Sequence, residues 1–228
     1  MKNLSKLQKF NIIFFGLVIV LCIILTIVLK FSFLALVACI SGIMYMAFLS
    51  DRNFLNFIIG FISSTTYIII AYQAKLYGEA IFYLFFDLPM ILVSYLFWRK
   101  HHETKFTVYP RKLNAKNTTL ICIVSLASVV GYGFLLKAMG DVSPFIDATS
   151  TVISFIATIL MTLRYREQWI MWIIVYVNGI LLWVVTFDLL MLIMAICCFI
   201  SSLLGYISWS RSQKIDESDK SLKLLKNN

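Results

Sequence analysis

Charged residues are scarce in this sequence: Asp, Glu, Lys and Arg together make up 14% of its 228 residues, whereas 61% are hydrophobic. A water-soluble domain of this length needs a more polar surface, so the composition excludes that class and indicates a polytopic membrane protein. Several apolar runs reach 18 residues or more. Each of them is long enough to cross about 30 Å of hydrocarbon as a helix.

Patterns for catalysis and metal binding are lacking as well. There is no Gly-Lys-Ser/Thr phosphate loop, no HExxH helix and no GxSxG turn. The five cysteines lie inside apolar runs without the spacing of metal ligands, so they are interpreted as small core residues. The adjacent His101 and His102 lie in a basic loop, where solvated surface is their usual place. We therefore expect no enzymatic activity, no cofactor and no metal.

Eight apolar runs separated by polar breaks predict eight transmembrane helices. The expected spans are residues 10–29, 31–49, 54–72, 80–98, 118–136, 145–163, 169–187 and 189–209. Three lysines precede the first run, as in a signal peptide. That run is too long and no small-residue cleavage site follows it, so a first span is favoured. Segment 99–117 is expected to be the one long loop, and the polar tail from residue 211 to be disordered.

Basic residues are distributed unevenly between the two sides of this eight-span arrangement. Of the 20 Lys and Arg residues, 17 fall on one side, and the other side holds Lys30, Lys75 and Lys137. Basic loops stay in the cytoplasm, so both termini are predicted to be cytoplasmic in a multi-pass protein of the inner membrane. Anchoring in a lipid bilayer thus accounts for the net charge of +9, and nucleic acid is not expected as a partner.

Two short patterns occur twice and predict an internal repeat. Tyr95-Leu96-Phe97-Trp98 ends the fourth span as Tyr206-Ile207-Ser208-Trp209 ends the eighth, and Asn53-x-x-Asn56-x-x-x-Gly60 opens the third as Trp169-x-x-Trp172-x-x-x-Tyr176 opens the seventh. Parallel triplets at 31–98 and 145–210, joined by a linking helix within 118–144, would hold a binding site between them near the midplane. The remaining segments are an N-terminal helix within 1–30, the loop 99–117 and the cytoplasmic tail 211–228.

The seventh span carries an aromatic face. At about 100° per residue, Trp169, Trp172, Tyr176 and Trp183 fall on one side of a helix. Such a face can stack on a flat ring, and a tyrosine hydroxyl can orient that ring. The alternative is an interfacial aromatic belt that binds nothing, which suits the first tryptophan better than the deeper tyrosine. Asn178 points away from this face, so contact with a neighbouring helix is favoured for it over contact with the same ligand.

Asp87 lies near the middle of the fourth span, one helical turn after Tyr83. A charge in a bilayer is costly and persists where it faces a cavity or a partner. Opposite an aromatic wall, this carboxylate suits a flat cation that bears hydroxyls, although a hydrogen bond between helices would also account for it. Pro89 is expected to kink the same span.

Further polar candidates lie in the third span, where Asn56 and Tyr67 belong to a polar stripe and Gln73 lies near the outer mouth. A hydroxyl stripe in the sixth span is interpreted as helix packing, because small residues let helices approach closely. The candidate binding residues are Trp169, Trp172, Tyr176, Asn178, Tyr83, Asp87, Gln73, Tyr67 and Asn56. The hydroxyl stripe consists of Ser150, Thr151, Ser154 and Thr158.

These residues resemble the PnuC family of vitamin transporters, which carry nicotinamide riboside. The resemblance runs from about Leu34 to Arg211. Its strongest parts are Tyr67-x4-Tyr72-x4-Tyr77-Gly78-Glu79, continuing through Pro89 to Trp98, and the Trp169-x-x-Trp172 pair. It implies a three-one-three bundle similar to SWEET transporters, often trimeric. It also implies facilitated diffusion, with the cargo trapped by intracellular phosphorylation for NAD biosynthesis.

Two positions depart from the family pattern. Tyr176 stands where the family usually has Asn or Asp four residues after the second tryptophan, and Tyr83 stands where it usually has Asn. Both positions would touch the cargo. The departures leave another nucleoside or a thiamine-like vitamin open as cargo.

Two other classes of membrane protein are alternatives to a carrier. An intramembrane enzyme needs a nucleophile with a base, or metal ligands, and no such group is visible at membrane depth. The substrate-capture subunit of an energised vitamin importer is also small, basic and polytopic. The repeat and the eight spans favour a self-sufficient carrier.

Overall fold

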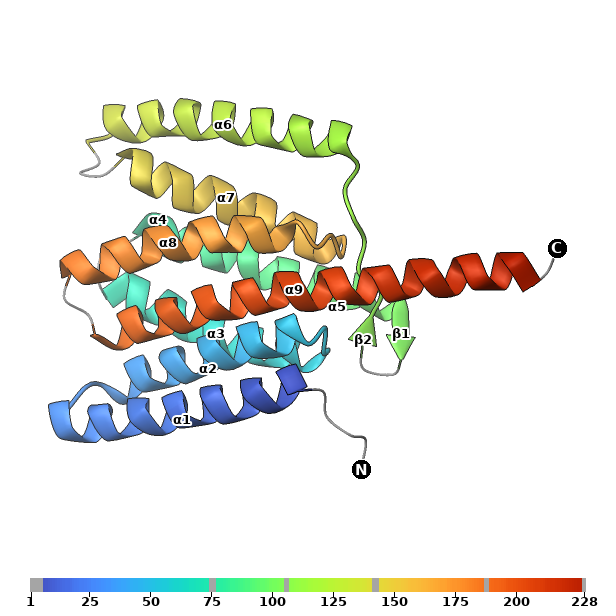
Figure 1. The fold of residues 1–228 in the computed structure, drawn as a ribbon. Coiled ribbons are helices and arrows are strands. Elements are labelled where there is room, and N and C mark those ends of the chain that lie inside the picture. Colours follow the sequence, from blue (N-terminus) through green and yellow to red (C-terminus); the bar gives the residue numbers. More distant parts are fainter. Residues whose placement is uncertain (1–5, 74–76, 105–106, 141–143, 187–188, 227–228) are drawn as a thin grey trace.

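The computed structural model describes residues 6–73, 77–104, 107–140, 144–186 and 189–226. Long helices lie side by side in it, with a short β-hairpin at one end of the bundle (Figure 1). The helices are α1 Lys6–Leu29, α2 Phe33–Ser50, α3 Leu55–Gln73, α4 Tyr77–Phe82, the π-helix η1 Tyr83–Asp87, α5 Leu88–Arg99, α6 Ala115–Ala138, α7 Pro144–Thr162, α8 Gln168–Thr186 and α9 Leu189–Lys226. The strands are β1 His102–Thr104 and β2 Thr107–Val108.

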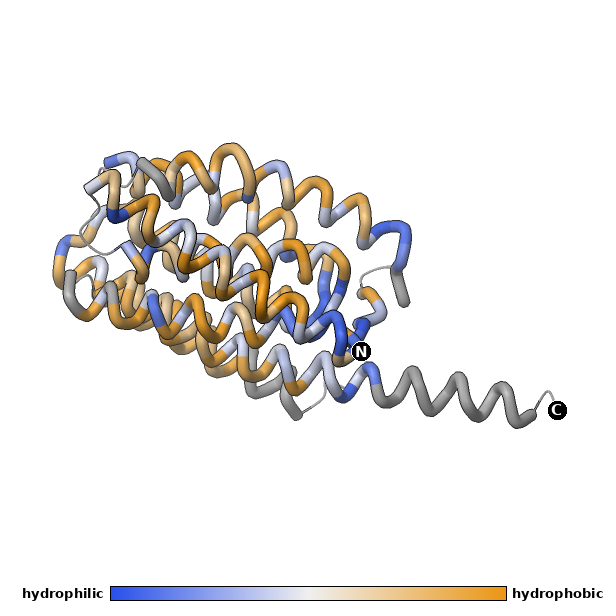
Figure 2. Tube along the Cα trace, turned by 90° about the horizontal axis from the view of Figure 1, so that it is seen from above, coloured by the Kyte–Doolittle hydropathy of each residue, from blue (hydrophilic) through white to orange (hydrophobic). Residues whose placement is uncertain are grey.

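Six helical stretches are long and apolar enough to cross a membrane: α2, α3, Ala80–Arg99, α6, α7 and Leu189–Gln213. Helices α1 and α8 are apolar too, over the shorter stretches Ile13–Leu29 and Gln168–Leu181. Apolar residues cover the helices, and hydrophilic ones gather at their ends (Figure 2). The prediction of an all-helical polytopic membrane protein is therefore confirmed.

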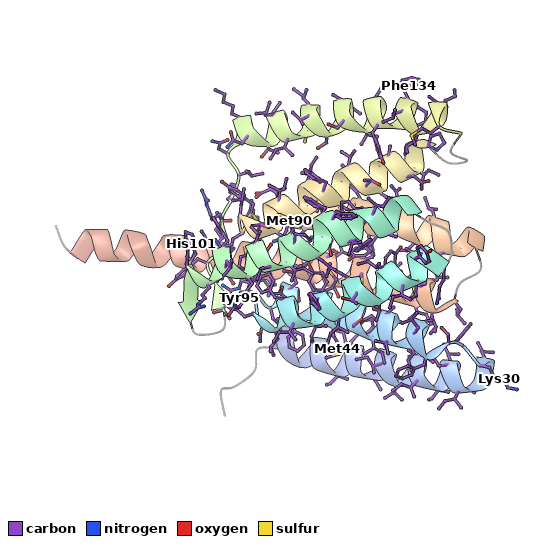
Figure 3. The ribbon with its side chains drawn as sticks, turned by 180° about the vertical axis from the view of Figure 1, so that it is seen from behind. Lys30, Met44, Met90, Tyr95, His101 and Phe134 are labelled. Atoms are coloured by element: carbon purple, nitrogen blue, oxygen red, sulfur yellow. The ribbon has the colours of Figure 1, made fainter. Side chains whose placement is uncertain are left out.

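The first two helices are joined by a very short turn. Lys30 adopts a positive φ of 54°, the left-handed conformation that commonly terminates a helix. The Ser32 hydroxyl then accepts a hydrogen bond from the Ala35 N–H at 3.1 Å and caps the start of α2. The tight hairpin predicted around residues 30–32 is thus observed, and Lys30 lies at the bundle end opposite His101 (Figure 3).

The fourth span is interrupted by a π-helix just before Pro89. Proline has no N–H, so the carbonyl one turn earlier, that of Phe85, loses its α-helical donor. The chain responds with a wider turn, in which the Leu88 N–H bonds to the Tyr83 carbonyl, five residues back. The irregularity expected at Pro89 therefore takes the form of a π-turn, a feature common at functional sites.

Helix α2 packs against α3 and α9, and α8 packs against α7 and α9. Helix α6 lies on α7 at one edge of the bundle and α1 lies on α2 at the other (Figure 1). Four of the cysteines are buried, as predicted. Cys122 is exposed because α6 packs only along one side against α7 and most of its side chains face outward. This arrangement leaves the central helices to form the cavity described below.

Segment 99–117 is more ordered than the predicted loop. After the hairpin it runs beside the α7–α8 turn: the Arg111 N–H donates to the Arg164 carbonyl at 2.7 Å, and the Arg166 N–H donates to the Arg111 carbonyl at 2.9 Å. The Leu113 N–H donates to Glu167 Oε2 at 3.1 Å. Burial, together with the charge of Arg111, lowers the pKa of the Arg164 guanidinium. The loop is thus fastened to the bundle.

The C-terminal tail is helical where the sequence was expected to be disordered. Helix α9 continues without a break to Lys226 and runs beyond the other helices (Figure 1). The prediction was based on polarity alone. It overlooked Asp216 and Lys220, and Asp219 and Lys223, acid–base pairs at the i, i+4 spacing that stabilises a helix.

Candidate functional site

Two adjoining pockets lie among the central helices. One, of about 90 Å³, contains Asp87 and is called the Asp87 pocket; the other, of about 110 Å³, contains Ser150 and is called the Ser150 pocket. The Ser150 pocket includes residues from the first half of α7 and the second half of α8. It therefore lies nearer the end of the bundle at which α6 is connected to α7, called here the α6–α7 end. Both pockets are lined by Tyr67, Phe82, Tyr83, Ser154, Tyr176 and Met194.

Asp87 supplies the only formal charge among the described residues that line the two pockets. The Ser64 hydroxyl donates a hydrogen bond to its Oδ2, which links α3 to η1. Because Tyr83 and Asp87 are the first and last residues of the π-turn, the wide turn brings both side chains to one cavity. A carboxylate held in an otherwise neutral cavity favours a cationic ligand.

Aromatic rings form much of the remaining wall. Trp172 and Tyr176 are nearly parallel, with ring centroids 6.0 Å apart and planes at 26°. The rings of Tyr67 and Tyr83 approach to 4.5 Å. Trp172 is 8% exposed, and its Nε1 has no hydrogen-bond partner within the described part of the chain. The cavity thus combines ring faces, one carboxylate and a buried N–H donor, which suits a flat cation with a hydrogen-bonding substituent.

The structure brings together five of the nine predicted residues: Tyr67, Tyr83, Asp87, Trp172 and Tyr176 all line the Asp87 pocket. Trp183, on the same aromatic face of α8, lines the Ser150 pocket.

The other four predicted residues lie elsewhere. Trp169 is fully buried against α9, with its ring centroid 5.8 Å from that of Trp209. Asn56 is fully buried and its side-chain amide donates to the Asn53 carbonyl. Gln73 is exposed at the end of α3, and Asn178 lines neither pocket.

Trp169 and Trp172 have different surroundings because α8 and α9 approach closely at the first of them. A Cβ added to Gly205 on α9 would lie 2.6 Å from the Trp169 ring, so this glycine makes room for the indole. Trp169 therefore packs between α8 and α9 while Trp172, one turn later, reaches the pocket. The shared helical face predicted for the two tryptophans is real, but only one of them borders the cavity.

Several lining residues were not among the predicted ones. Tyr45 of α2 lines the Asp87 pocket and donates its hydroxyl to Met161 Sδ at 3.2 Å; Met194 and Cys198 enter from α9. These helices are apolar on every side, so no periodic signal in the sequence identifies their inward face. For Ser150, Thr151 and Ser154 the sequence predicted a role in helix packing. That interpretation fits Thr158, which is 2% exposed, but the other three line the cavity.

The chain was also compared with known proteins. A family described as nicotinamide mononucleotide transporter matches residues 32–211. A nicotinamide riboside transporter PnuC of Neisseria mucosa is 36% identical over 194 residues, which cover 80% of this chain and 74% of that one. Its counterpart in Haemophilus influenzae is 30% identical over 186 residues, covering 80% and 81%. A crystal structure of the vitamin B3 transporter PnuC superposes with a TM-score of 0.83 at 28% identity, covering 94% of each chain.

Proposed function

The chain belongs to the nicotinamide mononucleotide transporter family, and from this premise we propose that it carries nicotinamide riboside, or a closely related flat cation with a sugar, across the cytoplasmic membrane. The single observation that carries the proposal is Asp87, held by Ser64 in a pocket walled by aromatic rings. A pyridinium ring against such rings gains about 2 kcal/mol when it is desolvated. The carboxylate balances its charge.

Transport in this proposal is downhill. No phosphate-binding loop occurs in the sequence, and the described lining residues include a single carboxylate and no basic group with which it could relay a proton. The cargo would equilibrate across the membrane, and intracellular phosphorylation would keep its free concentration low. We place both termini in the cytoplasm, on the side with 17 of the 20 Lys and Arg residues.

We further propose that α2–α5 and α7–α9 are parallel repeats joined by α6. Arg52 and Arg164 both have positive φ, 59° and 64°, and each donates to a carbonyl of the intervening loop, at Val108 and Tyr109 respectively. They lie 112 residues apart. The same offset pairs the fully buried amides Asn56 and Gln168. It lies one residue from the offset of 111 between the Tyr95 and Tyr206 motifs, and four residues, about one helical turn, from the offset of 116 between the Asn53 and Trp169 motifs.

The family resemblance also leads us to propose a homotrimer. Large apolar side chains are exposed along α6, among them Leu126 and Phe134, of which Figure 3 labels Phe134. Lipid or another copy of the chain would have to cover them. Chemical crosslinking of the purified protein would count the copies.

Uptake into liposomes tests the transport proposal. Purified protein, reconstituted without ATP or any other protein, should admit labelled nicotinamide riboside until the inside and outside concentrations are equal. A proton or sodium gradient should not change that end point. Thiamine and neutral nucleosides serve as competitors. No uptake by the chain alone would support a capture subunit of an energised importer instead, and accumulation above the outside concentration would make Asp87 an ion-coupling residue.

A further inference from the structure

We propose that the Ser150 pocket is a sugar subsite, in which the hydroxyls of Ser150, Thr151 and Ser154 bind those of the cargo's ribose. This inference rests on the proposed function and deepens it. It fixes the orientation of the cargo, with the aromatic cation in the Asp87 pocket and the sugar toward the α6–α7 end of the bundle.

The first observation is that these three hydroxyls make no hydrogen bond within the described part of the chain. All three residues line the cavity, and none of them hydrogen-bonds to any residue that the structure describes. Several other helical hydroxyls donate to the carbonyl one turn back, as Thr149 does to Phe145 at 2.7 Å and Thr162 to Thr158 at 2.8 Å. Ser201 and Ser210 also lack a partner among the described residues, but they line neither pocket. Hydroxyls left without such a bond beside a cavity are free to bind a ligand.

The second observation lies at the other end of the cavity. The Trp172 indole N–H is buried and has no partner within the described residues, although Trp172 lines the Asp87 pocket. A buried donor without an acceptor costs about 1–3 kcal/mol, which a ligand acceptor at this place would recover. Trp172 as donor and Asp87 as acceptor together match the carbonyl and the amino group of a carboxamide on a cationic ring.

The two pockets thus differ in chemistry in the way the two ends of a nicotinamide riboside differ. The Ser150 pocket has the hydroxyls of Ser150, Thr151 and Ser154 and no charged residue among its described lining. The Asp87 pocket also has serine hydroxyls, those of Ser63 and Ser154, but it alone has the carboxylate. Tyr67, Tyr83 and Tyr176 border both pockets, so the bond between ring and sugar would lie beside them. With the opposite orientation the carboxylate would face the ribose and the cation would face neutral hydroxyls.

Binding of four ligands to detergent-purified protein tests the subsite. The ligands are nicotinamide riboside, its 2′- and 3′-deoxy analogues, and 1-methylnicotinamide, which keeps the cation and lacks the sugar; the last is measured by displacement of the riboside. The variants are Ser150→Ala, Thr151→Val and Ser154→Ala. Thr149→Val is the matched control, because its hydroxyl already bonds to its own helix. Thermal melting confirms that each variant is folded.

Each cavity variant should weaken riboside binding about three- to tenfold, the loss expected for one neutral hydrogen bond. Binding of 1-methylnicotinamide should stay unchanged. For one of the deoxy analogues, which lacks the ribose hydroxyl that the mutated residue would bind, the variant and the parent should have equal affinity. The control should bind every ligand normally. Unchanged riboside affinity in all three variants, or equal losses for the riboside and 1-methylnicotinamide, would overturn the subsite. If the parent protein binds neither cation, the proposed function itself fails.

Discussion

Trp98 and Trp209 cross-tie the bundle: their rings are in contact, and each donates its indole N–H to a backbone carbonyl of a further helix. Trp98, in α5, donates to Met161 of α7 at 3.0 Å, and Trp209, in α9, donates to Leu49 of α2 at 3.4 Å. Both rings are fully buried, and their centroids are 5.9 Å apart. Four helices therefore meet at one aromatic contact, so loosening it should loosen the whole assembly.

Trp98→Phe should lower thermal stability more than Trp209→Phe, because its hydrogen bond is shorter. Each carbonyl keeps a backbone donor, the Arg164 N–H for Met161 and the Arg52 N–H for Leu49, both at 2.9 Å. The loss of the indole hydrogen bond alone should therefore cost about 0.5–1.5 kcal/mol. The double variant should lose less stability than the sum of the losses in the two single variants, since each single substitution already removes part of the contact between the two rings. Melting curves in detergent, read by intrinsic fluorescence, would check this. Additive losses, or a larger loss for Trp209→Phe, would contradict the cross-tie.

Asp87→Asn should discriminate between cargo charges. The variant keeps the shape of the side chain and can still accept from Ser64, but it no longer balances a cation. We expect binding of a cationic riboside to fall more than tenfold, since hydrogen bonds to charged groups are worth about 1.5–3 kcal/mol, and binding of a neutral nucleoside to change little. Ser64→Ala should give a smaller loss in the same direction. Calorimetry with both ligands measures it, and equal losses for the two would disprove the charge match.

Two tryptophans one turn apart on α8 should behave differently. Trp172 borders the Asp87 pocket, so Trp172→Ala should weaken cargo binding roughly thirtyfold, the equivalent of about 2 kcal/mol of desolvated cation–π contact. Trp169 packs against Trp209, so Trp169→Ala should cost about 3–5 kcal/mol of stability and leave the affinity of folded protein nearly intact. Trp172→Phe keeps a ring face but has no indole N–H, so it should weaken binding less than Trp172→Ala while still losing the hydrogen bond to the cargo. A folded Trp169→Ala protein with a comparable loss of affinity would place both rings at the ligand.

The order of the helices could be predicted from sequence because apolar runs and polar breaks determine it directly. Helix α2 was expected at residues 31–49 and lies at Phe33–Ser50; α7 was expected at 145–163 and lies at Pro144–Thr162. Pro89 indicated an irregular fourth span. Only the coordinates show that the irregularity is a π-turn, because a proline inside a helix can also be accommodated by a kink or a break.

The site was harder to predict than the helices. Helical periodicity places Trp169 and Trp172 on one face, but it does not say that Gly205 of a distant helix admits only the first of them. Asp87 could be identified because a charge in an apolar run is conspicuous. Tyr45, Met194 and Cys198 could not, since their helices are apolar all round and only packing decides which side faces the cavity.

Glu167 fastens the loop 99–117, so its loss should expose that loop. The carboxylate accepts from the Leu113 N–H and from the Arg166 guanidinium, both at 3.1 Å, and its residue is 8% exposed. Glu167→Ala leaves the buried Leu113 N–H unpaired and should release the segment around it. Trypsin, which cleaves after Arg and Lys, should then cut this segment after Arg111. Asp51→Asn is the matched control: it removes a carboxylate that has no hydrogen bond to the described part of this loop. Limited proteolysis in detergent should cut Glu167→Ala several times faster than the parent or the control. Equal cleavage of all three would show that the backbone bonds between Arg111 and the α7–α8 turn hold the loop by themselves.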